Sequence, residues 1–427
     1  MLLRRIPDRN IRVIYSAILL LGIAYGVSIA VLAIHLDAHG IPKLAMGGLA
    51  AAFALGIVSF SVPAGWCVQR FGAKRTLLVA LAGYAACVAA FPFLTTTMAL
   101  SVARFFDGAF SVAVWVAAET ALLSRSNAEN KAFVMSLYAM SLAVGYVLGP
   151  ILATGVVKLA GTGATFVVAG ALACMAALVI HARFRPDAER DAGRDGVHAD
   201  EAADNIADAS AVSSAREDAA REDAPAMPAL SVLWRTKTSC VGTFSYGYFQ
   251  ASVVLFLPLY LIETKRIPEE RTILITAFFA AGMLSASALV SRLGDRHGHL
   301  LVMRVLGAIG GTMVASFVLL SSFEAMCAAV FVAGATLASI SPVSLALQGV
   351  ILPKRDLGRA NAFYNAAYAA GMLLGPPISS VIFTRHGGGP MLMHLAALWA
   401  TFVTFTIVFA SDDPRRAREA RPSLETT

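Results

Sequence analysis

The run MALSVARFFDGAFSVAVWVAAETALL, residues 98–123, decides the fold. It is almost wholly apolar, and its only charged side chains are Arg104, Asp107 and Glu119. About 20 mostly apolar residues are enough for a helix that crosses the hydrocarbon core of a bilayer. The run therefore predicts a transmembrane helix. Each charge within it is costly, at about 2.5–3.5 kcal/mol on an insertion scale for an arginine or aspartate at the helix centre.

The rest of the chain has the same character. Its 427 residues are 58% hydrophobic and 14% charged, with a mean hydropathy of +0.70, whereas soluble domains are about half apolar and a quarter charged. We expect an all-α membrane protein with twelve transmembrane helices, at residues 11–35, 45–69, 76–94, 98–124, 132–157, 163–184, 238–262, 272–291, 300–321, 325–352, 359–384 and 391–411.

The positive charges predict the orientation of these helices. If the spans alternate, 27 of the 34 Lys and Arg residues lie on the side of the N-terminus and six on the other side, while Arg104 lies within a span. Loops rich in Lys and Arg stay in the cytoplasm. We therefore expect both termini inside the cell, in a multi-pass protein of the inner (plasma) membrane. The net charge of +7 then reflects topology, and no nucleic-acid partner is expected.

A polar segment divides the spans into six and six. Residues 186–230 contain 12 acidic and 4 basic residues and the tandem AREDAAREDA at 215–224. Such a segment has too few large apolar side chains to fold. We predict four regions: a six-helix bundle at 1–185, a disordered acidic cytoplasmic linker at 186–234, a second six-helix bundle at 235–413 and a basic cytoplasmic tail at 414–427.

The two bundles align at one offset of 226 residues. GWCVQRFG at 65–72 falls on SRLGDRHG at 291–298, and the glycine and proline motif at 145–150 falls on that at 371–376. A constant offset over separate motifs indicates that a six-helix unit was duplicated in parallel. Parallel halves related by an axis along the membrane normal are an architecture of secondary transporters.

These motifs resemble those of the major facilitator superfamily, over nearly the whole chain except the linker. The loop GWCVQRFGAK at 65–74 resembles the family signature Gly-x3-Asp-Arg-x-Gly-Arg-Lys, although Gln69 stands where the family has Asp and Ala73 where it has Arg. The resemblance implies a latch that closes the cytoplasmic side, formed by Gly65, Arg70, Gly72 and Lys74 and, in the second copy, by Asp295, Arg296 and Gly298.

Glu119 is our expected substitute for the missing carboxylate of this latch. It lies about five residues from the inner end of its helix, where the helix dipole disfavours a negative charge. We expect it to pair with Arg70, Arg75 or Arg125 as part of the cytoplasmic gate.

The charged pair of the fourth span carries a second resemblance. Leu100-x3-Arg104-x2-Asp107-Gly108 resembles the family pattern Leu-x3-Arg-x2-Gln-Gly, which implies a role in proton coupling. Residues at i and i+3 share a helix face and can pair. A self-neutralising pair that only helps packing is the alternative, but buried ion pairs are seldom better than hydrophobic residues of similar volume. Val330 and Ala333 occupy the equivalent positions of the second half.

A third resemblance lies in the fifth span. Gly145-x3-Gly149-Pro150 resembles a motif typical of exporters, and it recurs as Gly371-x3-Gly375-Pro376. Glycines four residues apart let a neighbouring helix approach closely, and proline bends a helix. We interpret both copies as helix-packing and gating elements, with a plain packing ridge as the alternative.

Polar side chains within the spans are candidates for a substrate cavity. We select Tyr25, Gln250, Gln348, Asn361 and Asn365, for which the alternative is interhelical hydrogen bonding. Few charges and many apolar residues favour a small amphipathic or weakly polar solute.

The sequence thus favours a secondary active transporter that moves a small organic solute by alternating access, as a proton-coupled exporter. The alternatives are a proton-coupled importer of a sugar or small carboxylate and, from another class, a non-transporting membrane receptor. An enzyme is not expected, because the chain has no Gly-x4-Gly-Lys-Ser/Thr, His-Glu-x2-His or Gly-x-Ser-x-Gly motif. We expect no cofactor and no metal; the partners are the solute, protons and the lipid bilayer, and the protein is expected to be a monomer.

Overall fold

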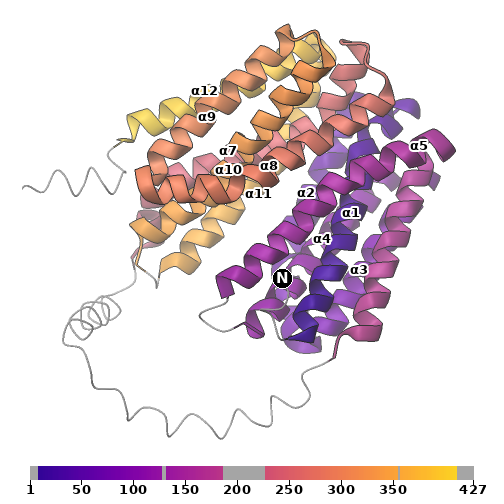
Figure 1. The fold of residues 1–427 in the computed structure, drawn as a ribbon, viewed down its shortest axis with the longest axis horizontal. Coiled ribbons are helices and arrows are strands. Elements are labelled where there is room, and N and C mark those ends of the chain that lie inside the picture. Colours follow the sequence, from indigo (N-terminus) through magenta and orange to yellow (C-terminus); the bar gives the residue numbers. More distant parts are fainter. Residues whose placement is uncertain (1–7, 127–130, 186–226, 354–355, 411–427) are drawn as a thin grey trace, which may run out of the picture.

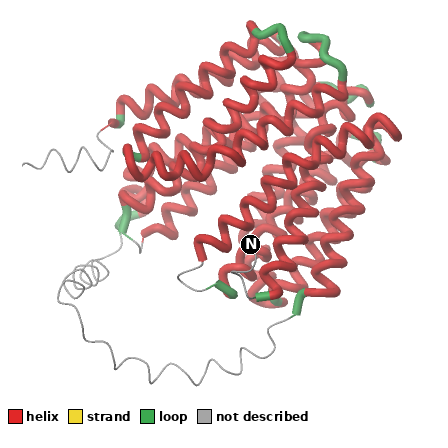
Figure 2. Tube along the Cα trace, viewed as in Figure 1, coloured by secondary structure: helices red, strands yellow, loops and turns green. Residues whose placement is uncertain are grey.

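A computed structural model describes residues 8–126, 131–185, 227–353 and 356–410. These residues are helical apart from short connections, which lie at the ends of the helices (Figure 2). The helices are α1 (Arg9–Ala38), α2 (Lys43–Phe71), α3 (Ala73–Ala90), α4 (Thr97–Ser124), α5 (Lys131–Arg183), α7 (Ala229–Glu263), α8 (Glu269–His297), α9 (His299–Ser316), α10 (Phe323–Ile351), α11 (Leu357–His386) and α12 (Gly388–Val408), with short 3-10 helices η2 (Phe91–Phe93) and η3 (Phe317–Leu319).

The all-α architecture is confirmed, and ten helices of the described ranges are long and apolar enough to cross a membrane. One of them, α5, consists of two helical segments that meet at Gly161, whose φ of 80° is not helical. Helix α8 is not among the ten, and it carries Glu269 and Glu270 in its first turn and Arg296 in its last. Each of the twelve predicted spans overlaps a helical stretch, and the crossing of a membrane by all twelve stays a prediction.

The 226-residue offset reappears in the backbone conformation. Gly72 and Gly298 both have positive φ, as do Gly161 and Gly387. Helices α4 and α10 begin at equivalent caps, since Thr96 accepts a hydrogen bond from the backbone N–H of Ala99 and Ser322 accepts one from that of Ala325. The two halves therefore make the same turns at equivalent positions.

Helix α7 begins earlier than expected. The linker was predicted to extend to residue 234, but the helix starts at Ala229. Val232 is buried against Leu352 and Ala360, and the Arg359 guanidinium donates a hydrogen bond to the Met227 carbonyl at 2.9 Å. These contacts order the start of α7. Residues 186–226 and the predicted tail lie outside the described ranges.

Glycines form a close seam between α1 and α5. A Cβ atom on Gly145 would lie 2.5 Å from the carbonyl carbon of Gly22, and one on Gly149 would lie 2.5 Å from the Cα of Gly26. The second half repeats the arrangement between α7 and α11. There, a Cβ on Gly371 would lie 2.2 Å from the carbonyl oxygen of Phe244. The glycine motifs predicted from the sequence thus lie where two helix backbones are in contact.

The two halves meet mainly at one end of the molecule. We call the end at which α1 ends and α2 begins the far end, and the end at which α5 ends and α7 begins the linker end. Figure 1 shows the halves in contact at the upper right and apart at the lower left. At the far end, a Cβ on Gly47 of α2 would lie 2.8 Å from the Pro376 carbonyl oxygen and 2.6 Å from the Ser380 hydroxyl of α11.

An ion pair fastens the halves at the same end. Lys43 Nζ of α2 lies 2.7 Å from Glu263 Oε1 of α7, and the same ammonium group lies 5.2 Å from the centre of the Phe383 ring of α11. One lysine of the first half therefore contacts two helices of the second.

Breaking this ion pair is expected to loosen the far end modestly. The two side chains are 23% and 37% exposed, and exposed ion pairs contribute about 0.2–1 kcal/mol. Lys43→Met and Glu263→Gln should each raise the fraction of molecules in which the two halves are apart at the far end, by at most about fivefold. Spin labels on Asp37→Cys and Thr264→Cys, in a background without the native cysteines, would measure the distance distribution between α1 and α7. The two changes would also be combined in a double-mutant cycle. If their effects simply add, the ion pair does not stabilise the closed far end.

Candidate functional site

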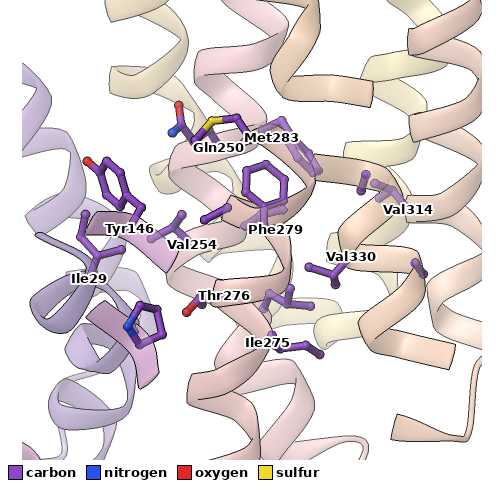
Figure 3. Close-up of a pocket in the computed structure, with 18 of the residues that line it drawn as sticks. Ile29, Tyr146, Gln250, Val254, Ile275, Thr276, Phe279, Met283, Val314 and Val330 are labelled. Atoms are coloured by element: carbon purple, nitrogen blue, oxygen red, sulfur yellow. The ribbon is translucent and has the colours of Figure 1, made fainter. Parts of the chain in front are cut away.

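A cavity of about 140 Å³ lies between the two halves. The first half contributes residues of α1 and α5, and the second half contributes residues of α7, α8, α9, α10, η3 and α12. Figure 3 shows Ile29 and Tyr146 on the side of the first half, and Gln250, Val254 and Phe279 on the side of the second. A site at the junction of two halves is positioned to respond to their relative movement.

The cavity wall is mostly apolar. Its polar side chains are Tyr146, Gln250 and Thr276, and no charged side chain lines it among the described residues. The amide of Gln250 is oriented, because its Oε1 accepts a hydrogen bond of 2.8 Å from the Tyr368 hydroxyl. Its amide nitrogen remains available as a donor. The wall can therefore hold an apolar molecule and offer a few directed hydrogen bonds.

Arg104 and Asp107 pair as the sequence predicted. An Nη of Arg104 donates a hydrogen bond to Asp107 Oδ2, and the guanidinium lies 4.3 Å from the centre of the Phe53 ring. Ser111 donates to Asp107 Oδ1 at 3.4 Å. Asp107 is 5% exposed, and a small void beside the pair reaches Ser28. The pair lies inside the first half and does not line the central cavity.

Symmetry nevertheless relates the pair to the cavity. The equivalent residues of the second half, Val330 and Ala333, both line it. The backbone crossing is the same in the two halves, since a Cβ on Gly108 would meet the Phe53 carbonyl oxygen at 2.1 Å and one on Gly334 would meet that of Phe279 at 2.2 Å. Arg104 and Asp107 thus occupy the counterpart of cavity-lining positions.

Four aromatic side chains connect the pair with the cavity. The Tyr25 ring is 4.9 Å from that of Tyr84, 6.2 Å from that of Trp115 and 6.1 Å from that of Tyr146, between ring centroids. Tyr146 lines the cavity, whereas Tyr25 is buried behind it. Tyr146 and Tyr84 were not predicted from the sequence. For Tyr146, the available signal was its place directly after Gly145 in the seam motif.

The other predicted cavity residues lie elsewhere. Gln348 is 2% exposed within α10, and Asn361 and Asn365 are exposed on α11. The amide of Asn365 donates to the Asn361 carbonyl at 2.9 Å. These three residues and Tyr25 are not among the lining residues, so Gln250 alone of the five predicted residues lines the cavity. Substrate contact by the other four stays a prediction.

Within the described part of the chain, Glu119 forms no ion pair with an arginine. Its carboxylate faces the hydroxyl of Tyr138 on α5. Arg125 instead binds Asp8, at 3.1 Å, and Arg70 is exposed at the end of α2. The expected ion pair is therefore absent from the described conformation, because a neutral hydroxyl from the neighbouring helix occupies the place of the cation.

Lys74 contacts the end of α5 in the described conformation, and its predicted role in the gate stays a prediction. Its ammonium donates hydrogen bonds to the carbonyls of His181 and Phe184, at 3.1 and 2.6 Å. Carbonyls at the end of a helix lack partners within it, and lysine can satisfy them. Lys74 thus joins α3 to the end of α5 within one half.

The remaining predicted gate residues lie at the linker end. Gly72 and Gly298, with φ of 80° and 97°, connect α2 to α3 and α8 to α9. A Cβ on Gly65 would have nothing within 4 Å. Arg296 lies in the last turn of α8, and the side chain of Asp295 is outside the described part of the structure.

Comparison with known proteins places this geometry in a family. The model of the Major Facilitator Superfamily matches residues 14–311 and again residues 239–426. An uncharacterized MFS-type transporter, YcaD of Escherichia coli (strain SE11), is 22% identical over 411 residues, which are 95% of this chain and 97% of YcaD.

Two solved structures share the fold. The nucleoside transporter NupG has a TM-score of 0.70 at 12% identity, with 94% of this chain and 98% of NupG covered. A D-xylose–proton symporter has a TM-score of 0.68 at 13% identity, with 93% and 97% covered.

Proposed function

The chain belongs to the Major Facilitator Superfamily, and from that premise we propose that it moves a small organic solute by alternating access, coupled to protons in the direction of export. The family and the relatives indicate a transporter and not an enzyme, which confirms that prediction. The solute, the direction and the coupling are the proposed part.

The observation that carries proton coupling is the pair Arg104–Asp107. An ionisable residue within a membrane span is by default a functional candidate. The pair is buried in one half, and its counterparts Val330 and Ala333 show that the fold forms without it. A neighbouring arginine favours the charged form of a carboxylate. Loss of that arginine, or of the water around the carboxylate, favours its protonated form. Movement between the halves would therefore change the proton affinity of Asp107.

Alternating access is supported by the unequal ends of the molecule. The far end is fastened by Lys43 and Glu263 and by the contact of Gly47 with α11. We place the linker end and both termini in the cytoplasm, and the multi-pass protein in the inner membrane. The end of α2 with Gly65 and Arg70, and the turns at Gly72 and Gly298, would then close the cytoplasmic side when the far end opens, as the cytoplasmic gate.

The cavity supports a weakly polar solute. A sugar has many hydroxyls, and each one that is buried without a partner costs about 1–3 kcal/mol. Tyr146, Gln250 and Thr276 are few partners for such a ligand. Import of a sugar or small carboxylate, and a receptor without transport, are the alternatives that the next experiment separates.

Asp107→Asn is expected to abolish solute-driven proton movement. The protein would be reconstituted in liposomes that contain a pH-sensitive dye, and pooled small molecules would be added. A compound that moves protons with the native chain should give no more than about a hundredth of that rate with the variant, because asparagine does not exchange a proton.

Asp37→Asn, at an exposed position of α1, is the matched control. Coupled flux that survives Asp107→Asn would remove Asp107 from the coupling role. Acidification that follows the solute inward would identify an importer. Binding of a solute without flux would identify a receptor.

A further inference from the structure

Unpartnered polar groups gather in the first half around Tyr25. The hydroxyls of Tyr25 and Tyr84, Nε of Arg104 and Nε1 of Trp115 are buried and make no hydrogen bond with the described residues. Buried polar groups in proteins almost always have a partner, and each that lacks one costs about 1–3 kcal/mol. Four such groups around one place therefore indicate that the cluster binds something polar and small.

The second half lacks this cluster. At the offset of 226 residues, Ala251 replaces Tyr25, Leu337 replaces Ser111 and Met372 replaces Tyr146. The same fold thus has apolar side chains at these three positions. Since helix packing does not require the polar groups, they serve something that only the first half does.

The groups form a path from the cavity to Asp107. Tyr146 lines the cavity, and its ring stacks on that of Tyr25 with an interplanar angle of 12°. The Tyr25 hydroxyl lies near Ser111 but makes no hydrogen bond with it, and Ser111 donates to Asp107 at 3.4 Å. Tyr146 and Tyr84 are both close enough to the Asp107 carboxylate for its charge to act on them. We call Tyr146, Tyr25 and Ser111 the tyrosine path.

Water is the ligand that suits the unpartnered groups around Tyr25. A void of about 10 Å³ beside Arg104 and Asp107 has about the space that one water molecule occupies. It lies at the Asp107 end of the path, and its lining includes Ser28 but neither Tyr25 nor Tyr146. A buried water makes two to four hydrogen bonds, and the groups around Tyr25 offer that number. The void at the Asp107 end is too small for a larger solute.

We propose that the tyrosine path, completed by bound water, is the route by which protons from the central cavity reach Asp107. This proposal rests on the proposed function, because it explains how a coupling carboxylate outside the cavity can respond to what the cavity holds. A solute against Tyr146 would displace the water that connects the path. The proton is handed between oxygens as each hydroxyl or water accepts one proton and releases another, so no net charge stays on a tyrosine.

Infrared difference spectroscopy tests the path without any solute. The full chain in lipid nanodiscs is shifted in pH and transferred to deuterated buffer, and the carboxyl band that Asp107→Asn removes reports Asp107. Tyr146→Phe and Tyr25→Phe keep their rings and are expected to slow hydrogen–deuterium exchange at that band at least about tenfold. Ser111→Ala should act in the same direction.

Tyr260→Phe is the matched control, because Tyr260 is buried in the second half, at 1% exposed, and its ring packs against that of Phe317 at 6.2 Å between centroids. It should leave the exchange rate unchanged. An unchanged rate in Tyr146→Phe and Tyr25→Phe would overturn the path, even if Asp107→Asn still abolished coupled flux. Slowed exchange together with coupled flux in Asp107→Asn would instead support the path and contradict the proposed function. A native protein without an exchanging Asp107 band would contradict both.

Discussion

Gly149→Leu is expected to destabilise the folded protein strongly and to lower its yield. A Cβ at this position would lie 2.5 Å from the Cα of Gly26 and 2.6 Å from the backbone nitrogen of Val27, and backbone atoms cannot move aside as a flexible side chain can. The leucine would have to separate α1 from α5 along the seam. Overpacking a core costs about 1–3 kcal/mol or more, a large fraction of the 5–15 kcal/mol that holds a typical domain together.

Gly155→Leu on the same helix provides the comparison. Gly155 is exposed, and a Cβ there would have nothing within 4 Å. Its replacement should fold as well as the native chain, since leucine also favours helix over glycine by somewhat under 1 kcal/mol. The monodisperse yield in size-exclusion chromatography and the thermal unfolding midpoint would measure both variants. Equal yields of the two would show that the seam tolerates a side chain.

Gly47→Leu is expected to prevent closure of the far end and to stop transport. The new side chain would overlap the Pro376 carbonyl and Ser380 of α11, and these contacts exist only while the two halves are together. Folding within each half should be unaffected. The state with an open far end should change from the minor to the dominant one. A shift in its ratio to the closed state from 1:99 to 99:1 corresponds to about 5.5 kcal/mol.

The adjacent Gly48 is the control, because a Cβ there would meet nothing within 4 Å. Spin-label distances between Asp37→Cys and Thr264→Cys should lengthen in Gly47→Leu and stay unchanged in Gly48→Leu. Solute flux in liposomes should fall to background only in the first variant. A native distance distribution in Gly47→Leu would show that the halves do not close at this place.

The fold was predictable because its signals are local in the sequence. Length and hydropathy identified the helices, and one offset identified the repeat, which Gly72 and Gly298 repeat in the backbone. The predicted end of the linker, and with it the start of α7, was wrong. The packing of Val232 against Leu352 and Ala360 joins segments more than a hundred residues apart. No pattern within the linker region carries that information.

The site was predictable only in part. Arg104 and Asp107 were identifiable because charges stand out in an apolar run, and their spacing fixed the pairing. Which polar side chain faces the cavity depends on the rotation of each helix against its neighbours, so Gln250 could not be separated from Gln348 or Asn365. The partner of Glu119 likewise depends on how α4 packs against α5. This packing places the Tyr138 hydroxyl beside the Glu119 carboxylate.

The asymmetry of the polar cluster bears on how such proteins diverge after gene duplication. The first half holds Arg104, Asp107 and the tyrosines, whereas the second half supplies most of the cavity wall, including Gln250. Because the two halves contribute different parts of the site, mutations in one half can be selected independently of those in the other. In a chimaera with a relative, dependence on the ion gradient should be inherited with the first half and preference among solutes chiefly with the second.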